Sequence, residues 1–313
     1  MSTNGTRVTV LMPCYNSMPY LTEAIESILN QSYKKFILLI IYDKSDDGSY
    51  ECALDYAKKD ERIKVVKNKY GKGVMNARNT GLELVDTEFA AIMDADDIAP
   101  VYRLEMEINY LDEHKEIGAV AGLARIIDVN GNKDYIFGCS SLNPNRIRCE
   151  MIFNDPIPNG STLIRNSEIK KNHLYYRDVE IEDYQFWCDL VLVTRMVILP
   201  YIMLLYRVTD TNLTNTIDKR VGHNERMKRL YNIHDFMFEK HNLRIGTFQK
   251  KHLYKILCEY KGPVPKWDKI VNYFTYGALI KQSKDMELSC EFLEVCKKNR
   301  RINLLEKIKM MIV

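Results

Sequence analysis

The sequence has no run of apolar residues long enough to span a bilayer as a helix. Its two most apolar windows, FILLIIY (36–42) and MVILPYIMLLY (196–206), fall well short of the ~20 residues that a spanning helix needs. The N-terminus is polar before a short apolar run, so no signal peptide is expected. The eight cysteines are scattered without a CxxC pair, which argues against a zinc site and favours a reducing compartment. We therefore expect a cytoplasmic location.

Several motifs that carry chemistry are also missing. The GKG stretch at 71–73 lacks the GxxxxGK[ST] spacing of a phosphate-binding loop, and the six histidines show no HExxH spacing. No interleaving of aromatic and basic residues marks a stacking platform, so a nucleic-acid partner is not expected. These absences argue against P-loop nucleotide hydrolases and helix-borne zinc hydrolases.

The formal net charge of +3 conceals an uneven distribution along the chain. Residues 216–313 contain 21 Lys and Arg and 11 Asp and Glu, a net charge of +10. Residues 1–215 contain 24 Lys and Arg and 31 Asp and Glu, a net charge of −7. An acidic front and a basic tail indicate two parts with different partners. We predict a first domain over 1–215 and a mostly helical, basic region over 216–313, interrupted at Gly262–Pro265.

The first hundred residues alternate between the periods of strands and helices. Short apolar runs predict strands at 8–12, 36–42, 63–66 and 89–93, and helical spacing predicts helices at 20–31, 50–59 and 74–85. Strands that are apolar on both faces and alternate with helices indicate an α/β fold with a doubly wound, mostly parallel sheet. A further strand is expected at 118–128, with a hairpin at Asn130-Gly131, and further apolar stretches occur at 161–165 and at 196–206.

Polar and turn residues follow each predicted strand of this series, and the densest group is DADD after the fourth. Ligands of open parallel sheets bind outside the carboxyl ends of the strands. The alternative, that strand-to-helix loops are polar in any protein, explains three neighbouring aspartates less well. Carboxylates at such a position form a site for a hard cation, and the cation would bridge Asp96 or Asp97 to a diphosphate. We therefore expect Mn²⁺ or Mg²⁺ as a cofactor.

Three separated motifs carry a resemblance to a known family. VTVLMPCYNSMPYLTEAIESILNQSY, GVMNARNTGLEL and AAIMDADDIAP resemble the nucleotide-sugar half of glycosyltransferase family 2, whose Rossmann-like fold is called GT-A. PNGSTLIRNSEI and VEIEDYQFWCDL resemble the family's acceptor-side motifs, so the likeness covers about Arg7 to Thr214. It implies a nucleotide-sugar half over about 1–111 and an acceptor half over 112–215.

The resemblance implies roles for individual residues. Those expected to bind the nucleotide or its diphosphate are Pro13, Tyr15, Asp43, Arg78, Asp94 and Asp96. Asp43 corresponds to the aspartate that bonds uracil in members that use uridine diphosphate sugars. Asp96 and Asp97 are expected to hold the metal.

Asp183 is expected to be the catalytic base, because members of the family invert the anomeric centre by direct displacement. A positioned carboxylate that removes the proton of the acceptor hydroxyl contributes perhaps ~10²–10⁴-fold in rate. Glu182 and Trp187 are expected to contact the sugar or the acceptor, because an aromatic wall suits the apolar face of a sugar. The alternative is that Glu182-Asp183 are charges favoured at a helix N-terminus and that Trp187 lies on the helix's core face.

The chain departs from the family pattern at two positions. The motif of two adjacent aspartates after the second strand is here Tyr42-Asp43-Lys44, which weakens the inference of uridine. Many members have a histidine two residues after a Tyr-Arg pair, and here that position is Thr209. The metal would then be held by aspartates and phosphates alone, and Arg207 could pair with phosphate.

Together these features predict an inverting, metal-dependent glycosyltransferase of the hexosyl- or N-acetylhexosaminyltransferase class. Its donor would be a nucleotide-diphospho-sugar, most simply a UDP-sugar, and its acceptor a glycan or lipid-linked glycan hydroxyl of a surface polysaccharide. The alternatives are a sugar-phosphate nucleotidyltransferase, which should carry a Gly-rich loop after the first strand, and an inactive nucleotide-sugar or glycan binder. The basic segment 297–313 has helical spacing that fits peripheral contact with an anionic membrane, or packing on the domain with a solvated basic face.

Overall fold

The computed structural model describes residues 5–179, 181–209, 222–259, 266–282, 288 and 290–299. The chain divides into two compact units. The first comprises Met1–Leu142 and Pro156–Asn215, and the second comprises Asn143–Asp155 and Thr216–Val313. The short segment Asn143–Asp155 therefore leaves the first unit and returns to it. The predicted domain boundary at 215/216 stays a prediction.

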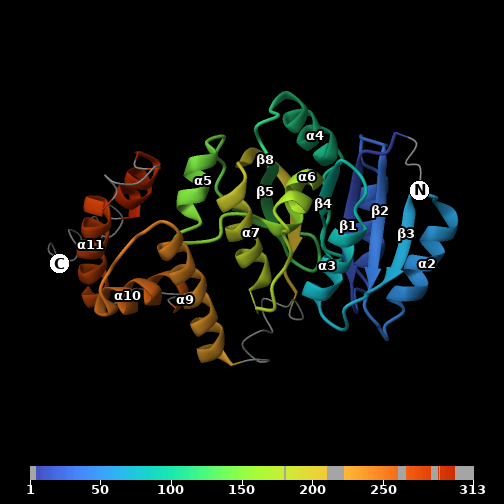
Figure 1. The fold of residues 1–313 in the computed structure, drawn as a ribbon. Helices are drawn as coiled ribbons and strands as arrows, with labels where there is room; N and C mark the ends of the chain where they lie inside the picture. The colour runs from blue at the N-terminus through green and yellow to red at the C-terminus, as the bar shows by residue number, and fades with distance from the viewer. Residues whose placement is uncertain are drawn as a thin grey trace. The chain divides into compact units, whose positions relative to one another are not determined.

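One mixed sheet forms the centre of the first unit, with the order β3-β2-β1-β4-β7-β5-β6 and with β8 paired to β5. Its strands are β1 (Val8–Cys14), β2 (Phe36–Tyr42), β3 (Ile63–Lys67), β4 (Phe89–Ile92), β5 (Ala119–Ile127), β6 (Lys133–Phe137), β7 (Thr162–Arg165) and β8 (Met196–Arg207). Figure 1 shows β1, β2 and β3 side by side at one end of the sheet, next to α2 (Ser49–Lys59).

The half of the sheet from β3 to β4 is parallel, as the apolar strands predict. β1 pairs in parallel with both β2 and β4, and β2 pairs in parallel with β3. β1 and β4 are almost wholly buried, which explains why these runs show no polar alternation. The predicted fold class is confirmed, and each predicted strand of this half differs from the observed one by at most two residues at an end.

The rest of the sheet is mixed. β7 lies antiparallel between β4 and β5, β6 forms an antiparallel hairpin with β5, and β8 runs parallel to β5. The predicted hairpin turn at Asn130-Gly131 is present, with Gly131 at φ +79°, in the left-handed region that favours glycine. The antiparallel β7 brings the chain back beside the carboxyl end of β4.

Helices cover the sheet of the first unit. They are α1 (Leu21–Leu29), α2, α3 (Val74–Leu84), α4 (Arg103–Glu113), α6 (Asn166–Lys171) and α7 (Glu182–Val193), with a short 3₁₀ helix at Asn159–Ser161. Gly81 lets α3 lie close to the strands, because a Cβ there would meet side-chain atoms of Leu11 and Ile41 at 3.1 Å. This close packing fixes α3 against β1 and β2, at whose carboxyl ends the predicted site lies.

The second unit is helical over the residues described, as its composition predicts. It contains α5 (Pro144–Glu150), α9 (His223–Lys240), α10 (Thr247–Tyr254), the π-helical turn Lys255–Glu259, α11 (Lys266–Gln282) and a helical stretch over 290–299. Its core centres on Phe153, whose ring lies 5.5–6.2 Å from the rings of Phe238, Tyr276 and Phe292. The predicted break at Gly262–Pro265 lies outside the described residues, and so do residues 300–313 of the basic segment 297–313, for which the sequence predicts membrane contact or packing on the domain.

Every helix in the described part of the chain is too short or too polar to cross a membrane. This agrees with the absence of a long apolar run in the sequence.

Candidate functional site

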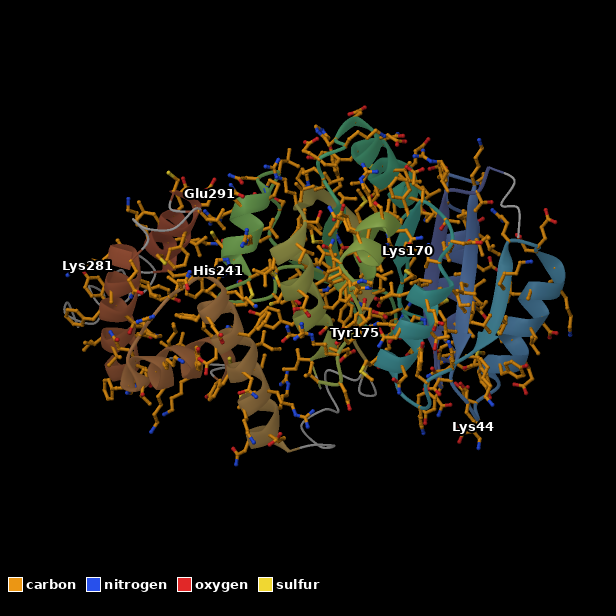
Figure 2. The ribbon with its side chains drawn as sticks, viewed as in Figure 1. Lys44, Lys170, Tyr175, His241, Lys281 and Glu291 are labelled. Atoms are coloured by element: carbon orange, nitrogen blue, oxygen red, sulfur yellow. The ribbon has the colours of Figure 1, made fainter. Side chains whose placement is uncertain are left out.

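The carboxyl edge of the parallel strands gathers the residues predicted to bind a nucleotide. The N–H of Asp43 donates to the carbonyl of Cys14 (2.9 Å), and the N–H of Met93 donates to that of Leu11 (3.0 Å). The segments after β1, β2 and β4 therefore leave the sheet at one edge, which Lys44 marks in Figure 2. The sequence prediction that these segments share one edge is confirmed.

Asp43 holds the loop before α3. Its side chain is buried, and one carboxylate oxygen accepts the N–H of Gly73 at 2.6 Å. Gly73 adopts φ +125°, which side-chain-bearing residues rarely reach, so the glycine permits this close contact. The neighbouring Tyr42, which stands in place of an aspartate of the family motif, stacks on Tyr50 with ring centroids 4.2 Å apart.

Tyr15 offers an exposed aromatic ring at the same edge, just after Pro13. Its side chain is 45% exposed. Lys72 donates from Nζ to the Tyr15 hydroxyl at 2.9 Å and lies 4.5 Å from the ring centroid. The edge thus presents an aromatic face and a cation, a pairing suited to a base and a phosphate.

A buried arginine lies between two carboxylates of the predicted site. Arg78 of α3 donates to Asp94 (Nη2 to Oδ1, 2.9 Å) and to Glu182 (Nη1 to Oε1, 2.8 Å). Its guanidinium also lies 5.3 Å from the centroid of the Tyr176 ring. Burial alone would lower the pKa of Arg78, but Asp94, Tyr176 and Glu182 raise it above its usual value. Arg78 therefore stays charged and ties the end of β4 to the start of α7.

The three aspartates after β4 occupy different environments. Asp94 also accepts a hydrogen bond from Asn159 Nδ2 at 3.2 Å. Burial, then the charge of Asp94, raises the pKa of Asp96 to about 6. Asp97 is 1% exposed, and burial followed by the charges of Asp96 and Asp94 raises its pKa well above the usual value. Burial and mutual repulsion therefore disfavour the ionised forms of Asp96 and Asp97.

Asp97 and Arg207 connect this cluster to the end of β8. One carboxylate oxygen of Asp97 accepts the backbone N–H of Arg207 at 2.8 Å, and Arg207 Nε donates to the carbonyl of Asp96 at 3.0 Å. The Arg207 guanidinium also pairs with Glu23 of α1. Thr209, at the position of the family histidine, is buried.

The donor set fits a divalent cation that is completed by phosphate oxygens. Within the ranges that the structure describes, no group of three or more His, Cys, Asp or Glu side chains is arranged to hold a metal. The second carboxylate oxygen of Asp97, however, is buried without a hydrogen-bond partner in the described part of the chain. Mg²⁺ and Mn²⁺ in phosphate sites often take one or two carboxylates and leave the other positions to phosphate and water. Asp96 and Asp97 match that pattern.

The N-terminus of α7 places Glu182 and Asp183 beside Arg78. Burial, then the charge of Asp183, raises the pKa of Glu182 to about 7, although Arg78 opposes this. Asp183 is only partly buried, and it accepts the N–H of Tyr184 at 2.8 Å. Glu182 is therefore paired with Arg78, whereas Asp183 is the more accessible carboxylate of the two.

Trp187 does not face a ligand in this structure. Its side chain is 0% exposed, and its ring packs edge-on against Phe186, with centroids 4.9 Å apart. Phe186 in turn stacks on Tyr176 at 4.2 Å. Because both faces of α7 are buried, the core position weighed from the sequence describes Trp187 better than the predicted contact with a sugar.

Sequence reasoning missed two residues of the site. Asn159, which bonds Asp94, lies in the PNGS stretch, so the resemblance of that stretch to an acceptor-side motif could have identified it. Tyr176, which lies under Arg78, has no local signal, because its role depends on a contact with a helix about a hundred residues earlier in the chain.

Comparison with known proteins shows which family the chain resembles. Residues 9–161 match the family model described as Glycosyl transferase family 2. Over that part of its length the chain is similar to members of this family. A curated relative from Haemophilus influenzae, described as an uncharacterized glycosyltransferase, is 32% identical over 211 residues, which cover 64% of this chain and 65% of the relative.

Another family relative has a more specific name. It is the UDP-Glc:alpha-D-GlcNAc-diphosphoundecaprenol beta-1,3-glucosyltransferase WfgD of Escherichia coli, 38% identical over 104 residues, which cover 33% of this chain and 40% of that protein. The chain thus spans less than two thirds of the length of both relatives.

Solved structures of glycosyltransferases share the GT-A fold. S. aureus TarS 1-349, solved in complex with UDP-GlcNAc, superposes with a TM-score of 0.62 at 17% identity and covers 95% of this chain and 89% of that chain. The mannosyltransferase PcManGT from Pyrobaculum calidifontis was solved with GDP-Man and Mn²⁺. It superposes with a TM-score of 0.52 at 16% identity, and the match covers 98% of this chain and 81% of that chain. At these identities the likeness establishes the fold alone.

Proposed function

We propose that this chain is an inverting, metal-dependent glycosyltransferase. It moves a hexose or N-acetylhexosamine from a UDP-sugar to a hydroxyl of a glycan or lipid-linked glycan. The observation that carries the proposal is the position of Arg78 between Asp94 and Glu182, because it joins the nucleotide edge of the sheet to the carboxylate pair that contains the candidate base. WfgD is named as an enzyme that uses UDP-Glc, and TarS was solved in complex with UDP-GlcNAc, which supports the choice of donor.

The nucleotide binds at the carboxyl edge of β1 and β2. The base lies against Pro13 and the exposed ring of Tyr15, and Asp43 accepts a hydrogen bond from it. Only one oxygen of Asp43 is committed to the Gly73 N–H, so its carboxylate retains further acceptor sites. Lys72, which lies over Tyr15, is close enough to the base site to contact the diphosphate.

Asp96 and Asp97 would hold a divalent metal. A bound Mn²⁺ or Mg²⁺ would supply Lewis-acid stabilisation of the charge that develops on the departing diphosphate. The raised pKa of both aspartates supports this role, because a cation is what makes their ionised forms favourable.

Asp183 removes the proton of the acceptor hydroxyl. As that proton moves to its carboxylate, the hydroxyl oxygen forms a bond to the anomeric carbon from the face opposite the diphosphate. The bond from the anomeric carbon to the diphosphate oxygen breaks, and the nucleoside diphosphate leaves with the electron pair. Because Glu182 is tied to Arg78, it orients this end of α7 and leaves proton transfer to Asp183.

The replacement Asp183→Asn tests the proposal. It should leave UDP and Mn²⁺ binding unchanged in calorimetry but lower transfer by ~10²–10⁴-fold, since only the base is lost. Transfer is measured from UDP-glucose and UDP-N-acetylglucosamine to a synthetic N-acetylglucosaminyl-diphospho-lipid. Asp189→Asn is the matched control, because Asp189 lies on the same helix but pairs with Arg177. Near wild-type transfer by Asp183→Asn would exclude it as the base.

A further inference from the structure

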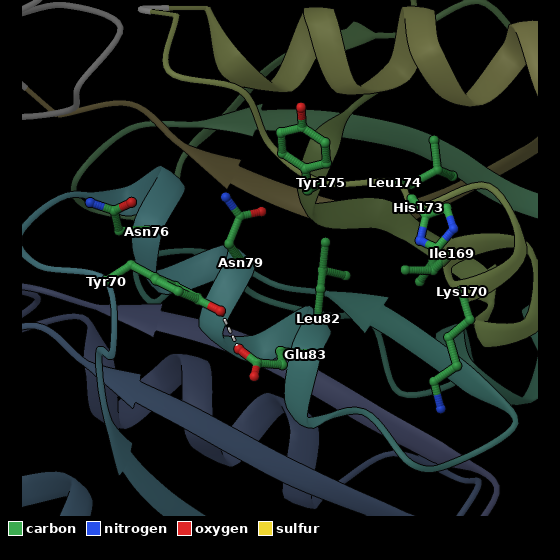
Figure 3. A pocket seen from close by; sticks show the side chains of 10 residues that line it. All are labelled: Tyr70, Asn76, Asn79, Leu82, Glu83, Ile169, Lys170, His173, Leu174 and Tyr175. Atoms are coloured by element: carbon green, nitrogen blue, oxygen red, sulfur yellow. Dashed lines mark hydrogen bonds between the residues drawn. The ribbon is translucent and has the colours of Figure 1, made fainter.

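A separate pocket of the first unit opens beside the candidate site, with a volume of about 690 Å³ (Figure 3). One wall is α3 with the loop before it, and the other is α6 with the segment that follows it. Its floor is apolar, because Leu82, Ile169 and Leu174 are buried. The volume lies within the ~300–1,000 Å³ typical of small-ligand sites.

Two tyrosines present exposed aromatic surface at the pocket. Tyr70 is 51% exposed and Tyr175 is 57% exposed, and Figure 3 shows Asn79 between their rings. The Tyr70 hydroxyl donates to Glu83, which also pairs with Lys69 at 2.5 Å. The Tyr70 ring is therefore held in place before any ligand arrives, and the charge of Glu83 is balanced within the protein.

The pocket shares a wall with the candidate site. Asn79 exchanges two hydrogen bonds of 2.8 Å with the backbone N–H and carbonyl of Tyr176, which joins α3 to the opposite wall. Arg78 and Tyr176 belong to the site, whereas their chain neighbours Asn79 and Tyr175 line the pocket. A molecule bound at the site through one end could therefore extend around this wall into the pocket.

We propose that the pocket binds a sugar ring of the acceptor glycan, remote from the hydroxyl that reacts. This inference rests on the proposed function. A sugar ring has an apolar face that packs on an aromatic ring, and hydroxyls at its edge that exchange hydrogen bonds with groups such as the Asn76 amide and the Glu83 carboxylate. Because Glu83 is already paired with Lys69, its charge does not have to be balanced by a ligand, which an uncharged saccharide could not do.

Binding to an array of immobilised neutral oligosaccharides tests the proposal. The labelled full chain is applied with EDTA and without nucleotide, so that donor binding does not contribute. Wild type should retain a defined set of saccharides, and Tyr175→Ala and Tyr70→Ala should each weaken that binding about tenfold or more, because aromatic anchors dominate such contacts. Tyr175→Phe keeps the ring and should bind like wild type.

Tyr135→Ala is the matched control. Tyr135 is 58% exposed, lies on β6 and does not line the pocket. No retained saccharide, retention that survives both alanine replacements, or equal loss in Tyr135→Ala would each overturn the proposal. Binding of UDP with Mn²⁺ is measured on the same variants and should be unchanged. A chain that fails to bind UDP but shows tyrosine-dependent saccharide binding would refute the proposed function and leave the pocket assignment standing.

Discussion

Replacing Arg78 with methionine should destabilise the first unit strongly. Methionine keeps much of the side chain's bulk but leaves Glu182 and Asp94 without their buried cation. The side chains of Arg78 and Glu182 are 7% and 8% exposed, so solvent screens this pair little. Removing one partner of a buried ion pair typically costs ~3–5 kcal/mol, because the other charge stays buried and unpaired.

The stability that Arg78→Met loses should be greater at high pH than at low pH. Without Arg78, the pKa of Glu182 in the folded state rises further above its unfolded value, because the group that opposes the effect of burial is gone. A carboxyl group with a raised folded pKa destabilises the protein when it must ionise, so the deficit should be largest at pH 8 and shrink towards pH 5. Adding Glu182→Gln to Arg78→Met should recover part of the stability at pH 8.

Thermal unfolding of the full chain measures the effect. For a unit of about 200 residues, each kcal/mol shifts the midpoint by ~2–4 °C, so Arg78→Met should lower it by ~6–20 °C at pH 8. The second unit provides an internal reference if it unfolds in a separate transition. A shift of under ~2 °C, or a deficit that grows as the pH falls, would refute the reasoning that Arg78 neutralises the carboxylates.

Three further predictions concern the nucleotide and metal residues. Burial raises the pKa of Asp96 to about 6, so protons compete with the metal below that pH. The affinity for UDP with Mn²⁺, measured by calorimetry, should therefore fall about tenfold per pH unit below pH 6. An affinity that does not change with pH would contradict this. For the same reason Asp96→Asn should stabilise the protein by about 1–3 kcal/mol at pH 8 and little at pH 4, while it abolishes metal-dependent binding. Asp43→Ala removes the acceptor of the Gly73 N–H and should weaken UDP binding about tenfold or more, whereas unchanged affinity would exclude a role for Asp43.

The sequence predicts the parallel half of the sheet well because local patterns determine it. Buried strands such as Phe36–Tyr42 must be apolar on both faces, and their carboxyl ends must meet at one edge. The position of Asp43 and of the aspartates after β4 follows from that rule. The sequence does not show which side chains pair with one another. Arg78 bonds Glu182, which lies 104 residues away in the chain, and Arg207 bonds Glu23, which lies 184 residues away.

The aromatic residues of α7 show the limit of local patterns. The sequence EDYQFW is compatible with two structures, an aromatic surface that contacts a sugar or a helix buried on both sides. Only the fold shows which of the two is present. In the structure Phe186 and Trp187 are fully buried, whereas the exposed Tyr70 and Tyr175 that line the neighbouring pocket come from loops outside the family motifs. Loop conformation depends on long-range contacts such as that between Asn79 and Tyr176, which no sequence period encodes.

The most direct test of the central claim is a thermal shift of the wild-type chain with UDP, GDP, CDP and TDP, each with and without Mn²⁺. A ligand at 100 times its dissociation constant stabilises the folded state by ~2.7 kcal/mol, or ~5–10 °C for a unit of this size. We expect UDP to raise the midpoint by that amount with Mn²⁺ and by far less without it. Stabilisation by none of the four nucleotides, with the metal present, would contradict the assignment of a nucleotide-sugar donor site.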